Sequence, residues 1–197
     1  MTVRQGADPG TATRILDTAE ELLQVRGYNA FSYADVAAAL KLTKASLHYH
    51  FPSKAELGVA LVTRYADRFA EGLDRIDEVG GRAPAKLVAY VDLYAQVISG
   101  GRMCLCGMLA AEYPTLPEPM QAGVRSFIDR NQSWLTAVLE QGTAEGSVHT
   151  NGTSADAAMM LLAGLEGAML VARPYADVER FESAARQLLA AVGVRHT

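Results

Sequence analysis

The residues best suited to chemistry lie between Leu40 and Lys54, where the chain has three lysines, two histidines and no acid. Leu47 and Phe51 are four residues apart, so a helix would turn both of them inward. The side chains left outside or at the edges are polar or aromatic: Lys44, Ser46, His48, Tyr49 and His50. Such a face suits the major groove of DNA, where a helix reads base edges and nearby cations neutralise phosphates. The sequence therefore predicts a DNA-reading helix from about residue 44 to residue 51.

A second short helix must hold the reading helix in place. Ser32 can cap this helix, and Asp35 stands three residues later, in the position of a capping-box acid. Residues 41–43 leave room only for a sharp turn, and Thr43 can cap the reading helix that follows. Pro52 cannot continue the reading helix, while Ser53 can cap the next one, whose first amides could clamp a phosphate. Residues 32–54 thus predict a helix-turn-helix.

Helical periodicity extends through the rest of the chain, and no β pattern is present. A first helix from Thr11 to Gly27 supplies the third wall of a small core. A long helix after Ser53 ends at Gly80 and links this core to the remainder. Further helices are expected over residues 84–99, 119–145, 154–171 and 178–192. We expect an all-α fold with an N-terminal three-helix helix-turn-helix DNA-binding domain, residues 1–52, and a helical-bundle ligand-binding and dimerisation domain, residues 53–197.

The stretch LTKASLHYHFPSKAEL resembles the signature of TetR-family transcriptional regulators. That signature reads as a small residue, Ser or Thr, Leu-Tyr-x-His or Leu-Tyr-x-Tyr, Phe, and then a short basic turn. The resemblance covers Thr11 to Leu57, and the family's helical effector domain would account for the remainder. His48 departs from the pattern, because the family usually has Tyr there, and it adds a group that can titrate near neutral pH.

The resemblance implies a set of DNA contacts. Phosphate contacts are expected from Ser32, Tyr33, Tyr49, His50 and Lys54, and base-reading positions are Lys44, Ala45, Ser46 and His48. We expect Lys44 to set specificity, because a lysine can donate to guanine O6 and N7. His50 is interpreted as a phosphate partner, since no second ligand cluster supports zinc, and neither a metal nor a cofactor is expected. Arg14 and Arg26 are interpreted as solvated helix charges.

The same resemblance implies an effector pocket between the long connecting helix and the helices that follow it. Its candidate lining residues are Tyr65, Phe69, Tyr90, Tyr94, Met103, Cys104, Cys106, Met108, Trp134, Glu166 and Met169. Each of them could instead belong to the core. Glu166 is the only charge in the apolar stretch AAMMLLAGLEGAMLV, so it should face a partner, a ligand or a dimer seam. The composition suggests an apolar or aromatic effector.

Cys104 and Cys106 allow two interpretations. On a helix they would point about 200° apart, which prevents a disulfide between them. They could be two small core residues. Alternatively they sense electrophiles or oxidants, because Gly100 and Gly101 could place one of them in the first turn of a helix, where a thiolate is stabilised. The segment CLCGMLAAEYPTLP also resembles the effector region of a cysteine-containing TetR subgroup.

Net charge and hydropathy limit the partners and the cellular location expected for the chain. Its net charge is −4, but residues 1–56 carry six basic and six acidic side chains. The excess of acid therefore lies in residues 57–197, which carry 12 basic and 16 acidic side chains. The acid-free segment around Lys41, Lys44 and Lys54 can still attract DNA locally. The N-terminus has no apolar signal core and no apolar run approaches 18 residues, so we expect a cytoplasmic protein without a membrane partner.

These observations predict a regulator that is not an enzyme. We expect a homodimeric repressor that binds a palindromic operator in double-stranded DNA and leaves it when a small apolar, aromatic or electrophilic effector binds. The dimer should form through the last two helices, because residues 154–171 are apolar on all sides. The alternatives are a transcriptional activator of the same fold, an all-helical enzyme with an apolar cavity, and a helical module that binds only protein. No nucleophile-base pair, metal spacing or phosphate loop supports the enzyme.

Overall fold

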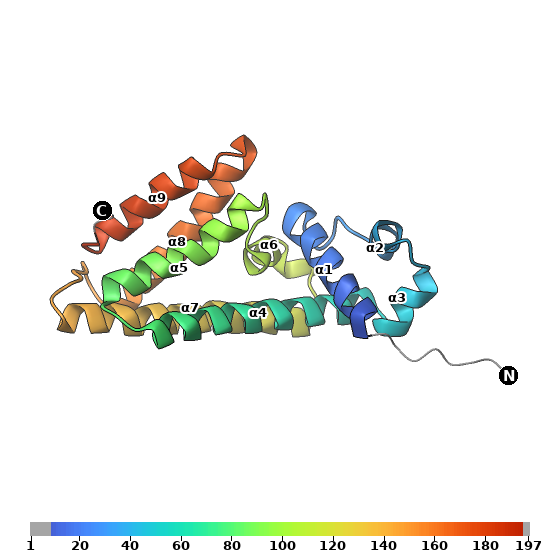
Figure 1. The fold of residues 1–197 in the computed structure, drawn as a ribbon, viewed down its shortest axis with the longest axis horizontal. Coiled ribbons are helices and arrows are strands. Elements are labelled where there is room, and N and C mark those ends of the chain that lie inside the picture. The colour runs from blue at the N-terminus through green and yellow to red at the C-terminus, as the bar shows by residue number, and fades with distance from the viewer. Residues whose placement is uncertain (1–8, 195–197) are drawn as a thin grey trace.

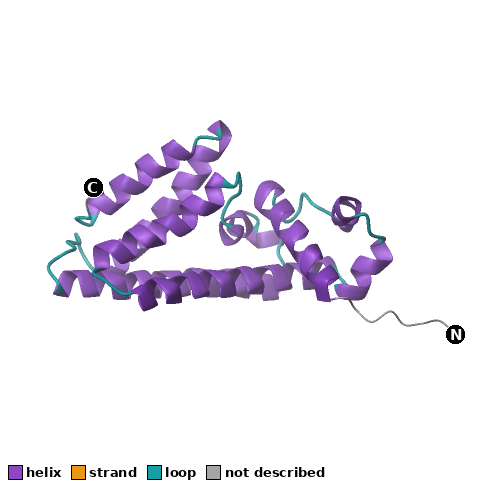
Figure 2. Ribbon diagram, in the orientation of Figure 1, coloured by secondary structure: helices purple, strands orange, loops and turns teal. Residues whose placement is uncertain are grey.

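The computed structural model describes residues 9–194, which form nine α-helices, two 3-10 turns and no strand (Figure 1, Figure 2). This confirms the all-α prediction. Helices α1 to α3 lie at one end of the molecule and α8 and α9 toward the other, with α4 running between the two ends. We call α1 to α3 the head, and α5 to α9 together with the part of α4 that packs against them the body.

The head consists of α1 (Pro9–Arg26), α2 (Tyr33–Leu40) and α3 (Lys44–His50). Their inward side chains form one apolar core, which includes Ile15, Leu23, Phe31, Val36 and Leu47. The Ser32 side chain and the Asp35 carboxylate cap α2 reciprocally, as the capping box predicts. Between α2 and α3 the backbone turns at Lys41, which has a left-handed φ of 56°. The head therefore has the predicted helix-turn-helix geometry.

The body is built on α4 (Lys54–Val79), α5 (Ala83–Ser99) and α7 (Glu118–Ala144). Figure 1 shows α4 and α7 side by side along the base of the molecule, and α4 packs against both α5 and α7. The first turns of α4 also pack against α1, where Leu57 and Leu61 are fully buried. One continuous helix thus joins the head core to the body core.

A short helix, α6 (Leu105–Ala111), and the 3-10 turn η1 (Tyr113–Thr115) occupy the segment between α5 and α7. The helices expected from sequence periodicity did not include this segment. Helix α6 packs against α1, α4 and α7, so it lies where the head meets the body. Its position makes it a second connection between the two parts.

Helices α8 (Ser154–Ala172) and α9 (Val178–Ala191), joined by the 3-10 turn η2 (Arg173–Tyr175), complete the body. They pack closely because Gly164 has no side chain: a Cβ there would lie 2.5 Å from Leu188 Cδ2. By length and composition alone, residues 154–175 would be apolar enough to cross a membrane, with a mean hydropathy of 1.6. In the fold this segment packs against α7 and α9 on one side, and fewer than half of its residues are buried.

Candidate DNA-binding surface and effector cavity

Helix α3 presents the predicted reading face to solvent. Lys44, Ala45, His48 and Tyr49 are exposed, with 63% of Tyr49 accessible, while Leu47 is fully buried beneath them. The Thr43 hydroxyl caps the helix by accepting from the backbone N–H of Ser46, at 3.1 Å. Ser46 and His50 are half-buried at the edges of this face. The base-reading positions expected from the sequence therefore lie on one open surface.

His48 is held at the end of the reading helix. Its Nδ1 lies 3.0 Å from the carbonyl oxygen of Pro52, and its ring centroid lies 4.8 Å from that of Tyr33. Tyr33 is largely buried, and its hydroxyl donates to the Phe51 carbonyl at 2.6 Å. Burial, with a smaller contribution from the charge of Glu56, raises the pKa of Tyr33 to about 12. The Tyr33 hydroxyl is therefore used inside the head and can meet a phosphate only if it shares or breaks this bond.

Lys54 begins α4 beside the reading helix. Its ammonium lies over the rings of Tyr28 and Phe31, 4.5 and 4.7 Å from their centroids. Burial lowers the pKa of Lys54, opposed by the charges of Glu112 and Asp35. Lys44, Lys54 and the exposed Ser32 border one shallow depression of about 330 Å³ between α2 and α3. Two cations and a hydroxyl are thus gathered at one edge of the reading face, as a phosphate contact requires.

The body has an apolar cavity of about 460 Å³ bounded by α6, α7 and α8. Four of the residues predicted to contact an effector line it: Met103, Cys106, Met108 and Glu166. The wall from α7 and α8 was missed, and its members include Phe127, Ile128, Gln132, Met159, Leu162 and Leu170. The spacing of Met159, Ala163, Glu166 and Leu170, at intervals of three or four residues, places these side chains on one face of a helix and could have identified this wall.

Seven other residues predicted to contact an effector do not line this cavity: Tyr65, Phe69, Tyr90, Tyr94, Cys104, Trp134 and Met169. The rings of the five aromatic residues among them pack on one another in the interior between α4, α5 and α7. The hydroxyl of Tyr90 donates to Asn131 Oδ1 at 2.9 Å, and the Trp134 ring stacks on Tyr90 while its Nε1 donates to Asp77 at 2.8 Å. Tyr90 and Asn131 are buried, so the bond between them satisfies polar groups of the interior, whereas Asp77 lies at the surface.

Glu166 joins this interior to the cavity. Its carboxyl lies against the backbone of α6, where a Cβ on Gly107 would come within 2.2 Å of Glu166 Oε2. Burial raises the pKa of Glu166, although hydrogen bonds from Cys104 and Tyr94 oppose this effect. These two side chains lie near the carboxyl, which also borders the cavity.

Both cysteines are free and buried, with 1% of each side chain exposed. Cys104 occupies the N-cap position of α6 without a capping hydrogen bond, and Cys106 lies in the first turn, as the alternative with a sensing cysteine anticipated. Burial, followed by the nearby charge of Glu166, nevertheless raises the pKa of both thiols. At neutral pH an incoming reagent would therefore meet neutral thiols and not thiolates.

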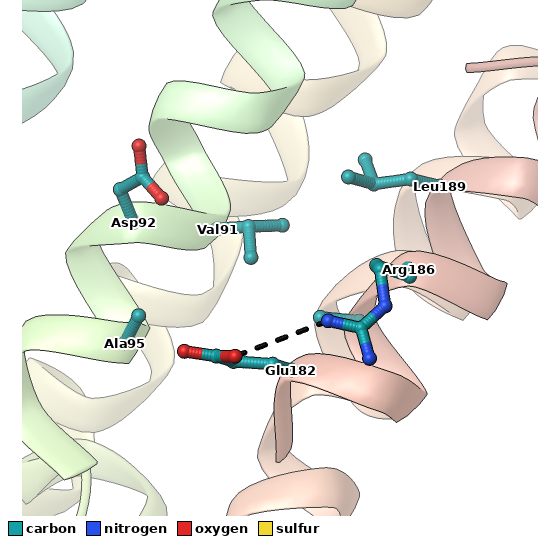
Figure 3. Close-up of a pocket in the computed structure, with 7 residues that line it drawn as sticks. Val91, Asp92, Ala95, Glu182, Arg186 and Leu189 are labelled. Atoms are coloured by element: carbon teal, nitrogen blue, oxygen red, sulfur yellow. Dashed lines mark ion pairs between the residues drawn. The ribbon is translucent and has the colours of Figure 1, made fainter. Parts of the chain in front are cut away.

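A smaller depression of about 200 Å³ lies between α5 and α9, and Figure 3 shows Asp92 at its rim together with the ion pair between Glu182 and Arg186. No residue predicted to bind an effector lines it. Within residues 9–194, no group of three or more His, Cys, Asp or Glu side chains could hold a metal ion.

Comparison with known proteins identifies both parts of the chain. Residues 15–61 match the sequence profile described as "Bacterial regulatory proteins, tetR family", and residues 83–188 match "Tetracyclin repressor-like, C-terminal domain". A TetR-family transcriptional regulator from Agrobacterium tumefaciens superposes with a TM-score of 0.90 and 35% identity, covering 94% of this chain and 99% of the other.

Two curated relatives carry functional names. Transcriptional regulator AcuR of Cereibacter sphaeroides is 27% identical over 160 residues, which are 78% of this chain and 72% of AcuR. The HTH-type transcriptional repressor NemR of Escherichia coli is 28% identical over 143 residues, which are 69% of this chain and 68% of NemR. Since the profiles together span the head and the body, this chain belongs to the TetR family of DNA-binding transcriptional regulators.

Proposed function

We propose that this chain is a dimeric repressor that binds a palindromic operator and is released by a small molecule entering the body cavity. The observation that carries the proposal is the open, acid-free face of α3, placed on a head that is continuous through α4 with a hollow body. The repressor NemR is a relative that supports repression over activation. A regulator of DNA acts where the DNA is, so we expect it in the cytoplasm, without a catalytic role.

The contacts with DNA follow from the geometry of the head. Lys44, Ala45, Ser46 and His48 would face base edges in the major groove, with Lys44 donating to a guanine. Ser32, Tyr33, Tyr49, His50 and Lys54 would bind the flanking phosphates. We propose that residues 1–52 form the DNA-binding domain and residues 53–197 the effector and dimerisation domain, with the first turns of α4 packed on the head.

The dimer would form through α8 and α9. Two apolar side chains of α8, Leu170 and Val171, are 61% and 63% exposed, and a Cβ on Gly167 would meet nothing within 4 Å. Residues of both helices border a shallow apolar groove of about 380 Å³. Exposed apolar surface of this kind on a helix pair is typical of an interface between subunits. A twofold axis at this interface must hold the two α3 helices roughly 34 to 36 Å apart, which is the distance between successive major grooves.

The cavity favours a small, mostly apolar effector, aromatic or electrophilic, that meets one carboxyl. Phe127 lines the cavity and also contacts the rings of Tyr65 and Phe69 on α4, with centroids 5.7 and 5.1 Å away. An effector that displaces Phe127 would therefore press on the helix that carries the head. Release follows if the effector binds more tightly to the state in which the heads are out of register with the operator.

The experiment is fluorescence anisotropy of labelled DNA from the region upstream of the chain's own gene, titrated with the protein across a salt series. A regulator gives saturable binding whose log affinity falls with log salt, and an unrelated duplex of the same length binds more weakly. Equal binding of both duplexes, or none at any salt concentration, contradicts the proposal. Sedimentation velocity of the protein alone tests the dimer, and a monomer at micromolar concentration would refute that part.

A further inference from the structure

The turn that follows α1 is tied to the body by hydrogen bonds to Glu112 and Thr115, and the Glu112 carboxylate accepts from two backbone amides of the turn. Glu112, at the end of α6, accepts from the backbone N–H of Tyr28 at 2.6 Å and from that of Asn29 at 3.2 Å. Gly27 begins the turn with φ of 93°, and a Cβ there would lie 2.9 Å from Glu112 Oε1. The carboxylate therefore fits directly against the backbone, and it bonds to two amides that α1 and α2 leave free.

Glu112 itself is held by the body. It ends α6, and the following turn η1 is fixed to α7 by Gln121, whose amide donates to the carbonyls of Tyr113 and Leu116 at 3.1 and 3.0 Å. The hydroxyl of Thr115 donates to the Glu112 carbonyl and accepts from the Asn29 side chain, both at 2.8 Å. The body thus presents a rigid acceptor, and a movement of α6 would be transmitted to the head.

The head side of this contact leads directly to the DNA-binding surface. Tyr28, whose amide is bound by Glu112, carries on its ring the ammonium of Lys54, a residue proposed to hold a phosphate. On the other side, α6 supplies Cys106, Gly107 and Met108 to the cavity wall, about one helical turn before Glu112. The contact therefore lies between the proposed effector cavity and the proposed phosphate clamp.

We infer that Glu112 is a positioning residue for operator binding: its carboxylate, bound to the Tyr28 and Asn29 amides, fixes the angle of the head on the body. The inference depends on the proposed function. Each head still binds its own half-site when the carboxylate is lost, because α3 is unchanged. Two heads that are free to move on the body no longer keep the spacing that a palindrome requires. The variant therefore loses affinity for the palindrome and keeps its affinity for a single half-site.

The test uses the full chain with duplexes that the parent protein selects from a randomised library, one containing the palindrome and one containing a single half-site. Glu112→Ala removes both charge-assisted bonds, so palindrome affinity should fall about tenfold or more. Half-site affinity should remain within about a factor of two or three of the parent. Glu112→Gln keeps the side-chain volume and one acceptor, and should give an intermediate loss. Glu140→Gln, an exposed acid near the far end of α7, is the matched control.

Three results would overturn the role of Glu112. Palindrome binding by Glu112→Ala and Glu112→Gln at the parent's affinity overturns the inference. The inference is also overturned if Glu112→Ala loses the same affinity for both duplexes and unfolds at a lower temperature than the parent, since this result shows only a damaged fold. A parent protein that selects no duplex overturns the proposed function itself, and this inference with it.

Discussion

Replacing Lys44 by alanine removes an exposed cation from the first turn of the reading helix. Lys41 and Lys44 are exposed and Lys54 is half-buried beside them, so a dimer brings six lysines to the DNA. If each neutralises one phosphate, the slope of log affinity against log salt is about −5 for the parent and about −3.5 for Lys44→Ala. If Lys44 instead donates to a guanine, the slope stays near the parent value. The affinity then falls by about 1–3 kcal/mol per subunit for the operator alone.

Fluorescence anisotropy across a salt series measures both quantities on the same duplex. Arg75→Ala is the control, because it removes one exposed positive charge from the body half of α4 and leaves the head unchanged. The parent and Arg75→Ala should have equal slopes. A Lys44→Ala protein with the parent's affinity and the parent's slope would refute the assignment of α3 as the reading helix.

Three further predictions concern the body. Val171→Glu places a charge on the exposed α8 face and should shift the protein from dimer to monomer in sedimentation velocity, and an unchanged sedimentation coefficient would refute the proposed interface. Tyr90→Phe leaves Asn131 Oδ1 without its buried donor and should lower the free energy of unfolding by about 1–3 kcal/mol in urea titration, whereas no change would show that the bond is dispensable. Burial raises the pKa of Glu166, so the stability it contributes is full below its ordinary pKa of 4.5 and is lost as pH rises through the folded value. Glu166→Gln should therefore gain thermal stability relative to the parent as pH rises from 4.5, and a difference independent of pH would contradict this sign.

The sequence predicted the head well because its signals are local. Ser32 and Asp35 cap α2 as expected, Gly27 follows the end of α1, and Pro52 follows the end of the reading helix. Each of these effects acts within a few residues of its cause. The exposure of the α3 face follows from the four-residue spacing of its two apolar side chains.

The lining of the body cavity was harder to predict, because it depends on how distant helices pack. Tyr90, Tyr94 and Trp134 are aromatic in sequence whether they line a cavity or fill a core, and only the packing of α5 and α7 shows that the Trp134 ring stacks on Tyr90. Glu112 gave no sequence signal at all, since its partners lie more than 80 residues away in the chain. Contacts of this separation are not visible in local periodicity.

The placement of Cys104 determines how fast chemistry could reach it. Its sulfur has almost no contact with solvent and lies among Tyr65 and Glu166, so a reagent waits for a local opening of the bundle. The observed rate would then be the intrinsic reactivity of a neutral thiol multiplied by the small fraction of time spent open, as in amide hydrogen exchange. Modification of the Cys104 sulfur would therefore require prolonged exposure to a reagent and would not occur during a brief exposure.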